Sequence, residues 1–184
     1  MTTPTTTINR IYWSVLEDAH WTLHIAALED GLCFIGSHGQ SVDELDAWAK
    51  ARYPKHHLIR NDEMLLPYKE ELTRYFQGEL QQFSLPFAVQ GTPFQEAVWR
   101  ALQQIPYGQT CSYSDIALSI QKPASVRAVG AAIGANPLLI TIPCHRVIGK
   151  NGALTGYRGG IEMKVRLLEL EKSRSQPVQG VHHG

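Results

Sequence analysis

The first third of the chain alternates short apolar runs with polar turns, a pattern typical of strands rather than of long helices. Acidic residues and Gly31 separate three such runs, which lie at residues 11–16, 21–27 and 32–35. Short apolar runs bounded by turn residues favour neighbouring antiparallel strands. We therefore predict a three-stranded meander at the start of the fold.

Two helices are predicted after the meander. Ser41, followed three residues later by Glu44, forms a capping-box pattern, so a helix is expected to begin there and to end near Pro54. A second helix is expected over residues 68–76, where apolar side chains recur at helical spacing before Gly78. The first half is therefore expected to be α+β, and no group of residues in it suggests chemistry.

The periodic pattern is lost between residues 81 and 91, and this stretch divides the chain. It contains Pro86 and no helical or strand-like spacing, so we predict a linker there. We accordingly predict two small domains, at residues 1–85 and 86–174. The tail at residues 175–184 is expected to be disordered, as chain ends commonly are.

The second half is expected to be mostly helical. Thr92 and Gln95 form a capping box around Pro93, which predicts a helix that begins at once after the linker. Ser112 with Asp115 predicts the start of another, shorter helix. The breaks between the predicted helices are short, so the helices are expected to be neighbours in space.

A third helix in this half, at residues 124–135, is predicted to have two different faces. An apolar face that would dock on the core holds Val126, Val129 and Ile133. The opposite face carries one cation and almost no side-chain bulk, and holds Arg127, Gly130, Ala131 and Gly134. Glycine inside a helix costs on the order of 1 kcal/mol relative to alanine. Either this smooth face packs on a neighbouring helix, or the helix and the short one before it form a helix-turn-helix that approaches DNA.

The distribution of charge favours the DNA interpretation. Residues 1–90 hold 7 Lys+Arg and 12 Asp+Glu, a net charge of −5, whereas residues 91–184 hold 10 and 5, a net charge of +5. A polyanion is therefore expected to meet the second half. A smooth helix also suits the minor groove of double-stranded DNA, which is about 6 Å wide. Arg127 could fill the place of a nucleotide extruded from the stack.

Composition narrows the remaining classes. The sequence has no run of 18 apolar residues, and its Thr-rich start lacks the apolar part of a secretory signal, so we predict neither a membrane span nor export. A cytoplasmic location is the simplest expectation. The three cysteines, at positions 33, 111 and 144, are too few and too widely spaced for a disulfide framework or a metal knuckle. We expect free thiols, no metal and no cofactor.

Cys144 is the candidate nucleophile. The apolar run at residues 138–142 predicts a buried strand that would hold Cys144 rigidly at its end. A cysteine is a useful nucleophile only where a base or cation assists its ionisation, and His145 is adjacent. The last helix, at residues 161–171, is expected to turn Ile161, Val165 and Leu168 inward, which would place Glu171 beside the apolar stripe.

A half-buried carboxylate needs a partner, and His145 is the one that we propose for Glu171. The order would be Cys144, water, His145, Glu171. The alternative is structural: a buried cysteine, a satisfied core histidine and a solvated carboxylate at the end of a helix. Cys33 and Cys111 have no base beside them in the sequence and are interpreted as structural.

Several motifs resemble one known family. Pro143-Cys144-His145-Arg146-Val147, with Asn136-Pro137 upstream and Gly156-Tyr157-Arg158-Gly159-Gly160 downstream, is similar to the signature of the methylated-DNA–protein-cysteine methyltransferases, also called O6-alkylguanine-DNA alkyltransferases. Four further pieces agree in order and spacing: Thr92-Pro93-Phe94-Gln95, Tyr107-Gly108, Ser112-Tyr113 and Arg127-Ala128-Val129-Gly130. The resemblance covers about residues 91–172, and the first half weakly resembles the ribonuclease-H-like amino-terminal domain of that family.

The resemblance implies an irreversible, single-turnover repair reaction. An alkyl group, methyl above all, would pass from the O6 atom of guanine, or possibly the O4 atom of thymine, to Cys144 of the protein itself. His145 and Glu171 would activate the thiol through water. Tyr113 would help to extrude the nucleotide and would donate a proton toward N3 of the leaving guanine.

Further residues receive roles from the same resemblance. Arg127 would occupy the vacated stack, and the smooth strip of Gly130, Ala131 and Gly134 would lie against the DNA. Asn136 is assigned to the DNA-binding region, where it would brace the turn between the recognition helix and the active site. The pocket for the alkylated guanine would be formed by Pro137, Val147, Tyr157 and Arg158.

The partner implied is double-stranded DNA that carries O6-alkylguanine, bound through its minor groove by a monomer. Two other functions are kept open. A lesion-sensing DNA-binding protein would bind damaged DNA without accepting the alkyl group. A cysteine hydrolase that uses Cys144 and His145 would turn over an acyl substrate and would need an oxyanion hole, for which the sequence shows no separate feature.

Overall fold

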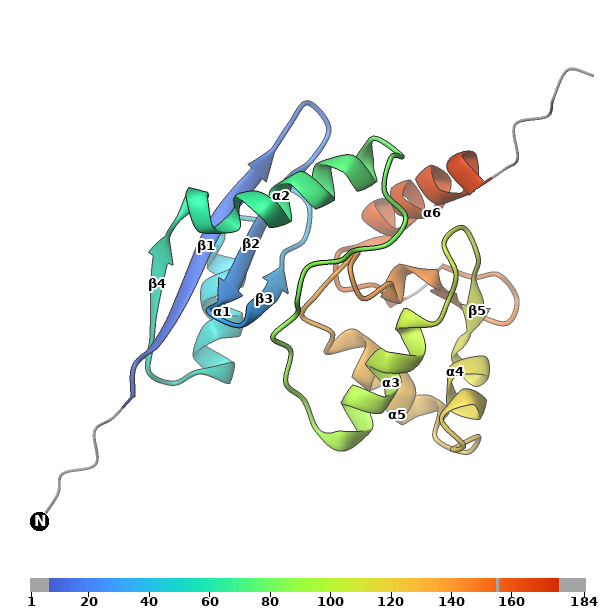
Figure 1. The fold of residues 1–184 in the computed structure, drawn as a ribbon. Coiled ribbons are helices and arrows are strands. Elements are labelled where there is room, and N and C mark those ends of the chain that lie inside the picture. The colour runs from blue at the N-terminus through green and yellow to red at the C-terminus, as the bar shows by residue number, and fades with distance from the viewer. Residues whose placement is uncertain (1–6, 155, 176–184) are drawn as a thin grey trace, which may run out of the picture.

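The computed structural model describes residues 7–154 and 156–175, and the tail predicted beyond Ser175 lies outside them (Figure 1). The first half contains β1 (Asn9–Glu17), β2 (Thr22–Leu28), β3 (Gly31–Ile35), α1 (Val42–Arg52), β4 (His56–Arg60) and α2 (Asp62–Phe76). The second half contains α3 (Pro93–Gln103), β5 (Cys111–Ser112), α4 (Tyr113–Ser119), α5 (Val126–Gly134), a 3-10 turn (Cys144–Arg146), β6 (Val147–Ile148) and α6 (Ile161–Ser175). The α+β class is therefore confirmed.

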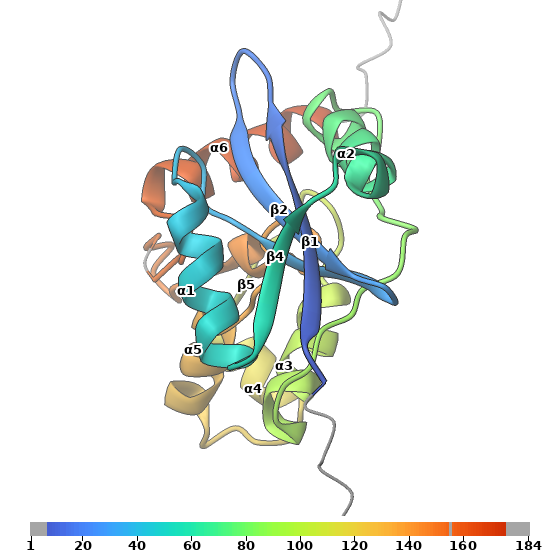
Figure 2. The ribbon, with the colours of Figure 1, turned by 90° about the vertical axis from the view of Figure 1, so that its left-hand side faces the viewer.

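The predicted meander forms three adjacent strands of a four-stranded sheet, with β3 at one edge. Its strand order is β3-β2-β1-β4, and β1 pairs with β2 in antiparallel register, Tyr12 opposite Ala27. The edge strand β4 runs parallel to β1, with Ile11 opposite Leu58. Figure 2 shows this sheet from its outer side, with α1 across one part of it and the second half of the chain behind it. The alternation of side chains along the strands divides the core accordingly.

The two faces of the sheet bury different sets of side chains. One face packs on α1 and contains Ile11, Ala26, Cys33, Phe34, Leu45 and Ala49. The other face packs on α2 and on the second half, and a continuous apolar core runs from Ile25 and Ile35 to Val98, Leu139 and Leu167. The two halves therefore share one hydrophobic core and do not meet through a hydrated interface.

The segment predicted as a linker is docked on the sheet. The backbone N–H of Leu32 donates to Pro86 O at 3.0 Å, and the N–H of Ala88 donates to Leu32 O at 2.8 Å. These bonds continue the edge of β3 for one residue and satisfy backbone groups that would otherwise be unpaired. The stretch is irregular, as expected, but it is fixed in place.

Two features of the first half differ from the prediction. β4 was not predicted, because an edge strand with the sequence His-His-Leu-Ile-Arg has no clear alternation. The second helix begins at Asp62, not at 68, because Asn61 caps it and Pro67 lies inside its first turns. At α1 the predicted capping box is only half formed. Ser41 caps the helix, but the Glu44 carboxylate accepts from the N–H of Ser37 at 2.7 Å.

In the second half the predicted capping boxes are confirmed, and those at Thr92 and Ser112 both close in full. The predicted inner face of the last helix is wrong. Ile161 is 45% exposed and Val165 and Leu168 are half-buried, while Met163, Lys164, Leu167 and Glu171 are buried. The burial of Lys164, whose charge favours an outward position, turns the inner face away from the predicted stripe. Val126, at the first position of α5, is also exposed rather than docked on the core.

The strand predicted at residues 138–142 does not exist. The run is fully buried, but it forms successive tight turns: the N–H of Thr141 donates to Leu139 O and that of Ile142 donates to Leu138 O. Ile140 has φ +70, a conformation that β-branched residues rarely adopt. A short apolar run predicts burial equally well for a strand and for a packed loop, and here a neighbouring side chain decides for the loop.

Candidate active site

The side chain of Asn136 determines the shape of the loop that holds Cys144. Its Nδ2 donates to Leu138 O at 3.2 Å and to Ile142 O at 3.0 Å, while its Oδ1 accepts from the N–H of Leu138 at 2.9 Å. Nδ2 also lies 3.3 Å from Cys144 Sγ. The amide thus replaces the partners that a strand would supply, and it places a donor on the sulfur.

Asn136 is completely buried, so a direct contact between its side chain and DNA is excluded. The bracing of the turn after α5, which the sequence also suggested, is what the structure shows. Cys144 follows at the start of the 3-10 turn and is 3% exposed. The thiol is therefore almost completely shielded from solvent and lies beside the Asn136 amide.

His145 and Glu171 meet as the sequence predicted. His145 Nε2 lies 2.6 Å from Glu171 Oε2, and both side chains are buried. The other ring nitrogen, Nδ1, is buried and has no hydrogen-bond partner within residues 7–154 and 156–175. A carboxylate accepts only from a protonated nitrogen, so Nε2 carries the proton and Nδ1 is left as the basic nitrogen.

Arg146 neutralises the same carboxylate. Its Nε donates to Glu171 Oε1 at 2.7 Å and its second guanidinium nitrogen donates to Oε2 at 3.1 Å, while the third donates to Ile105 O at 2.7 Å. Arg146 belongs to the conspicuous five-residue motif, yet the sequence analysis gave it no role. Its position directly after His145, the proposed base, is the sequence feature that could have suggested a role for Arg146.

Two further donors complete the shell of Glu171. The hydroxyl of Tyr75, on α2 of the first half, donates to Oε2 at 2.5 Å, and the backbone N–H of Gly108 donates to Oε1 at 3.2 Å. Tyr75 was missed because its position in a helical apolar pattern predicts an ordinary core residue. Only the folded chain brings it to a residue 96 positions away.

The electrostatics of the network follow from burial and hydrogen bonding. Burial alone would raise the pKa of Glu171, but the bonds from His145, Arg146 and Tyr75 outweigh it and hold that pKa well below its usual range. Burial lowers the pKa of His145, against the opposing effect of Glu171. The resting state therefore combines an ionised Glu171, paired with Arg146, and a neutral imidazole.

Cys144 is a thiol at rest. Burial raises its pKa, and the hydrogen bond from Asn136 and the charges of Arg158 and Lys164 oppose that effect. The sequence analysis expected a group that helps the thiol to ionise, and these three groups act in that direction without overcoming desolvation. Ionisation must therefore be coupled to a proton acceptor nearby, for which His145 Nδ1 is available.

Of the residues predicted to form the guanine pocket, Val147 donates its backbone N–H to Cys144 O and Tyr157 is close enough to Cys144 for their charges to interact, whereas Pro137 lines a cavity that Cys33 also lines. Pro137, Val147 and Tyr157 are all buried, and Lys164 Nζ donates to Val147 O at 2.6 Å. The Tyr157 hydroxyl is buried without a hydrogen-bond partner in the part of the chain that the structure describes. Close packing extends to Gly159, where an added Cβ would lie 2.7 Å from the Tyr157 ring.

The side chain of Arg158 turns away from this pocket and joins the two halves. It donates to Ile35 O at 2.7 Å, to Pro137 O at 3.2 Å and to Asn136 O at 3.2 Å. These bonds occupy the guanidinium, so a contact between residue 158 and a base would come from its backbone. The guanidinium fixes the Asn136 turn to the edge of β3.

The smooth face of α5 is exposed. Arg127, Ala131 and Gly134 face solvent, and a Cβ added at Gly134 would meet nothing within 4 Å. A Cβ added at Gly130 would meet only the Tyr113 ring, at 3.9 Å. The alternative that this face packs on a neighbouring helix is therefore excluded for the described residues. Tyr113 also approaches the Gly156 turn, so it stands between α5 and the segment that carries Tyr157.

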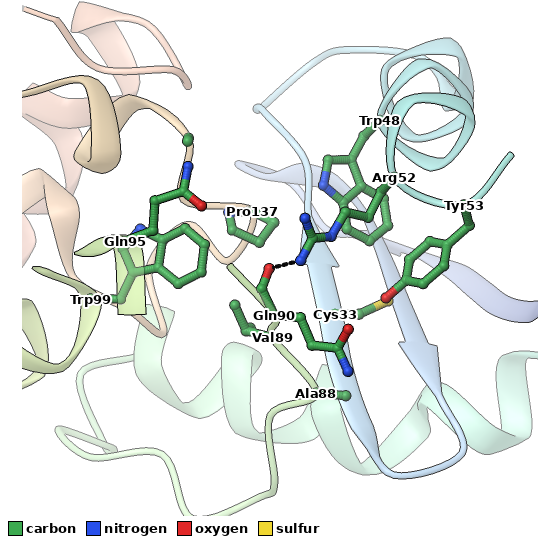
Figure 3. Close-up of a pocket in the computed structure, with 11 residues that line it drawn as sticks. Cys33, Trp48, Arg52, Tyr53, Ala88, Val89, Gln90, Gln95, Trp99 and Pro137 are labelled. Atoms are coloured by element: carbon green, nitrogen blue, oxygen red, sulfur yellow. Dashed lines mark hydrogen bonds between the residues drawn. The ribbon is translucent and has the colours of Figure 1, made fainter. Parts of the chain in front are cut away.

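The other two cysteines have different surroundings. Cys33 lines a cavity of about 140 Å³ between the halves, with Trp48, Arg52 and Tyr53 on one side and Trp99 on the other (Figure 3). Burial raises the pKa of Cys33 to about 12 and that of Cys111 to about 11. No histidine lines the Cys33 cavity.

Among the described residues, no cluster of three or more His, Cys, Asp or Glu side chains could hold a metal ion. In the same residues, no helix is both long enough and apolar enough to span a bilayer.

Comparisons with known proteins agree on one family. The family model of the 6-O-methylguanine DNA methyltransferase DNA-binding domain matches residues 93–173, and the model of its ribonuclease-like domain matches residues 11–89. The inducible methylated-DNA–protein-cysteine methyltransferase of Bacillus subtilis is 56% identical over 172 residues, which cover 94% of this chain and 96% of the relative. A relative of the same name from Methanosarcina acetivorans is 39% identical over 89% of this chain and 99% of its own length.

Solved structures show the same arrangement. The crystal structure of the O6-methylguanine methyltransferase of Mycobacterium tuberculosis has a TM-score of 0.77 and 38% identity, and covers 91% of this chain and 96% of that one. The M. tuberculosis protein in complex with DNA has a TM-score of 0.76 and 39% identity, with coverage of 90% and 94%.

Proposed function

Since the chain belongs to the methylated-DNA–protein-cysteine methyltransferase family, we propose that Cys144 is the residue that accepts the alkyl group. The chain binds DNA and repairs it by direct transfer of an alkyl group to a cysteine of the protein itself. The proposal identifies the cysteine that accepts the alkyl group, the residues that assist it and the alkylated base that is repaired. Its main support is that Cys144 alone, among the three cysteines, adjoins a histidine whose second nitrogen is bonded to a buried carboxylate.

The reaction proposed is a displacement at the alkyl carbon of O6-alkylguanine. The Cys144 thiol passes its proton through a water molecule to His145 Nδ1, and the sulfur attacks the carbon. The carbon–sulfur bond forms as the carbon–oxygen bond breaks, and guanine regains a proton as it leaves. Glu171 holds the imidazole in the required tautomer and stabilises it once it is protonated. The product thioether has no group nearby to reverse it, so each molecule acts once.

Tyr113 and Arg127 are proposed to act on the DNA. α5 would enter the minor groove with the face formed by Arg127, Gly130, Ala131 and Gly134, because this face is exposed and offers almost no bulk. Arg127 would fill the place of the extruded nucleotide. Tyr113, beside Gly130 and the Gly156 turn, would crowd the phosphate and donate a proton toward guanine N3. Extrusion costs a few kcal/mol, less for a base pair weakened by alkylation.

The protein is proposed to act as a monomer in the cytoplasm, on double-stranded DNA. One chain supplies the cysteine, the base and the carboxylate, so no second copy is needed to complete the site. The compartment follows from the substrate and from three free thiols, which are kept reduced where glutathione and thioredoxin are present.

Intact mass after a single turnover tests the proposal. The purified chain is mixed with duplex DNA that contains one O6-methylguanine, and the expected result is one added methyl group, mapped to the peptide that contains Cys144. Cys144→Ser should bind the same duplex and gain no mass, while the matched variant Cys33→Ser should gain one methyl group. A methyl group on Cys33 or Cys111 would overturn the assignment. Tight binding without any gain of mass would instead indicate a lesion-sensing protein.

A further inference from the structure

The catalytic carboxylate receives a hydrogen bond from the opposite half of the molecule. Tyr75 lies near the end of α2 and is completely buried, and its hydroxyl donates to Glu171 Oε2 at 2.5 Å. His145 Nε2 lies 2.6 Å from the same oxygen atom. The ribonuclease-like half, which carries no chemistry in its own sequence, thus contacts the proton relay directly.

We propose that Tyr75 is a positioning residue of the alkyl transfer reaction, which sets the basicity of His145 through the oxygen atom that both residues share on Glu171. This proposal rests on the proposed function of Cys144 and His145. It also gives the first half a role in the reaction beyond its contribution to the core.

Tyr75 and His145 compete for one acceptor, the Oε2 atom of Glu171. A carboxylate oxygen that accepts a strong hydrogen bond from a phenol has less electron density for a second donor, so it stabilises an imidazolium less well. Without the Tyr75 hydroxyl, Oε2 would bind the His145 N–H more strongly. The imidazole would then become more basic and would be protonated, and therefore unable to accept a proton, over a wider range of pH.

Tyr75 remains a donor throughout the working range. Burial and the negative charge of Glu171 raise its pKa well above the usual value for a phenol. Its ring is held by three aromatic neighbours, with the centroids of Phe83, Phe76 and Tyr107 at 5.5, 5.6 and 6.2 Å. The hydroxyl therefore cannot turn away from Glu171 to find another partner.

The other charged and titratable groups around His145 come from different elements. Arg146 lies on its own turn, Glu171 and Lys164 lie on α6, Cys144 precedes it, and Tyr75 lies on α2. Arg146 donates two hydrogen bonds to Glu171, and Lys164 Nζ donates to Val147 O. The Tyr75 hydroxyl is the only one of these groups that can be deleted without changing a charge or the nucleophile.

The experiment compares Tyr75→Phe with Tyr107→Phe. Tyr107 is a matched control because its ring packs in the same cluster, while its buried hydroxyl has no hydrogen-bond partner among the described residues. The single-turnover rate of methyl transfer from duplex DNA is measured from pH 5 to pH 9 for both variants and for the unaltered protein.

Tyr75→Phe should move the acid limb of the rate profile toward higher pH. A displacement of one pH unit would slow the reaction about tenfold at pH values well below both midpoints. Tyr107→Phe should give the same midpoint as the unaltered protein. A Tyr75→Phe profile with an unchanged midpoint overturns the proposal, even if the rate falls equally at every pH, because a merely structural role would produce that result.

A second measurement does not depend on the folding of Tyr75→Phe. Incorporation of 3-fluorotyrosine at position 75 alone makes the phenol a stronger donor and should move the acid limb in the opposite direction, to lower pH. An unchanged midpoint here also counts against Tyr75. Failure of the underlying function would look different, since the unaltered protein would then add no methyl group to Cys144 at any pH.

Discussion

Cys33 and Cys144 are both almost completely buried, and burial raises the pKa of both thiols. They differ in what surrounds them. Cys33 lies between a sheet and a cavity lined by Trp48, Arg52 and Tyr53. Cys144 has an amide donor at 3.3 Å, two cations that lower its pKa and an adjacent histidine backed by a carboxylate.

The comparison indicates that Cys144, the proposed nucleophile, differs from Cys33 through its neighbours and not through a low resting pKa. A thiol with a raised pKa is protected from oxidation until a substrate arrives, because the thiolate is the form that reacts. The adjacent base then makes ionisation possible within the complex. Removing that base should make Cys144 behave like Cys33.

The largest effect is therefore expected from His145→Gln. Without a proton acceptor, the single-turnover rate of methyl transfer should fall by about 10²-fold to 10⁴-fold, the usual contribution of general base catalysis. Binding to the methylated duplex should change little, because His145 is completely buried. Both quantities can be measured on the same preparation by quenched mass spectrometry and fluorescence anisotropy.

His24→Gln is the matched control, since His24 lies in the first half and its Nδ1 is also buried without a partner in the described residues. It should leave the rate unchanged. If His145→Gln transferred methyl groups at the normal rate, the difference between Cys144 and Cys33 would have to lie in access alone.

The next effect concerns stability. Glu171→Gln removes the negative charge that pairs with Arg146, whose side chain is only 8% exposed. A buried ion pair that loses one partner typically costs about 3–5 kcal/mol of unfolding free energy. For a chain of this size the melting temperature should fall by roughly 6–20 °C. Glu169→Gln, on the exposed side of the same helix, should leave it unchanged. Equal melting curves for the two variants would show that the ion pair contributes nothing net.

The sequence predicted one contact within the candidate site better than it predicted the path of the chain. Cys144, His145 and Glu171 were chosen from residue types and spacing, and the contact between His145 and Glu171 was confirmed. The strand expected before Cys144 is a packed loop, because the Asn136 amide binds the carbonyls that a strand would have paired. Hydrophobic periodicity reports burial and cannot report a side chain that takes the place of a neighbouring strand.

Two other misses have a related cause. Lys164 is charged yet buried, and a pattern that expects an exposed lysine rotates the inner face of the last helix away from it. The contact of Tyr75 with Glu171 could not be predicted from local sequence, because the two residues are 96 positions apart. Local signals performed well in comparison: the capping boxes at Thr92 and Ser112 lie within four residues each, and both are present.

A smaller effect distinguishes binding of the damaged DNA from the methyl transfer step. Gly134→Leu adds bulk to the exposed face of α5, where a Cβ meets nothing within 4 Å, so the fold should be preserved. Affinity for the methylated duplex should fall at least about tenfold, or 1.4 kcal/mol, because the face would no longer fit a narrow groove. Methyl transfer from the free base O6-methylguanine, which needs no DNA groove, should be unaffected, and a parallel loss there would place Gly134 in the active site instead. Lys172→Leu, on the exposed last turn of α6, controls for added apolar surface.

The smallest effect tests the raised thiol pKa, which is the property that Cys33 and Cys144 share. The pKa of Cys33 is raised from an ordinary value near 9 to about 12 in the folded chain, so the unfolded chain loses this proton first as the pH rises. The contribution to stability is complete below pH 9 and declines as the pH rises from 9 toward 12. Between pH 8 and pH 10 the loss should be about 1–2 kcal/mol. Cys33→Ala should remove the Cys33 part of that slope while lowering stability at every pH by a constant amount, because the small void left by the sulfur does not titrate. Urea unfolding at several pH values measures both. Cys144→Ala should also make the alkaline slope shallower, since burial raises the pKa of Cys144 too. A slope in Cys144→Ala as steep as in the unaltered protein would mean that Cys144 ionises at its ordinary pKa in the folded protein, and that its neighbours already outweigh burial before any DNA is bound.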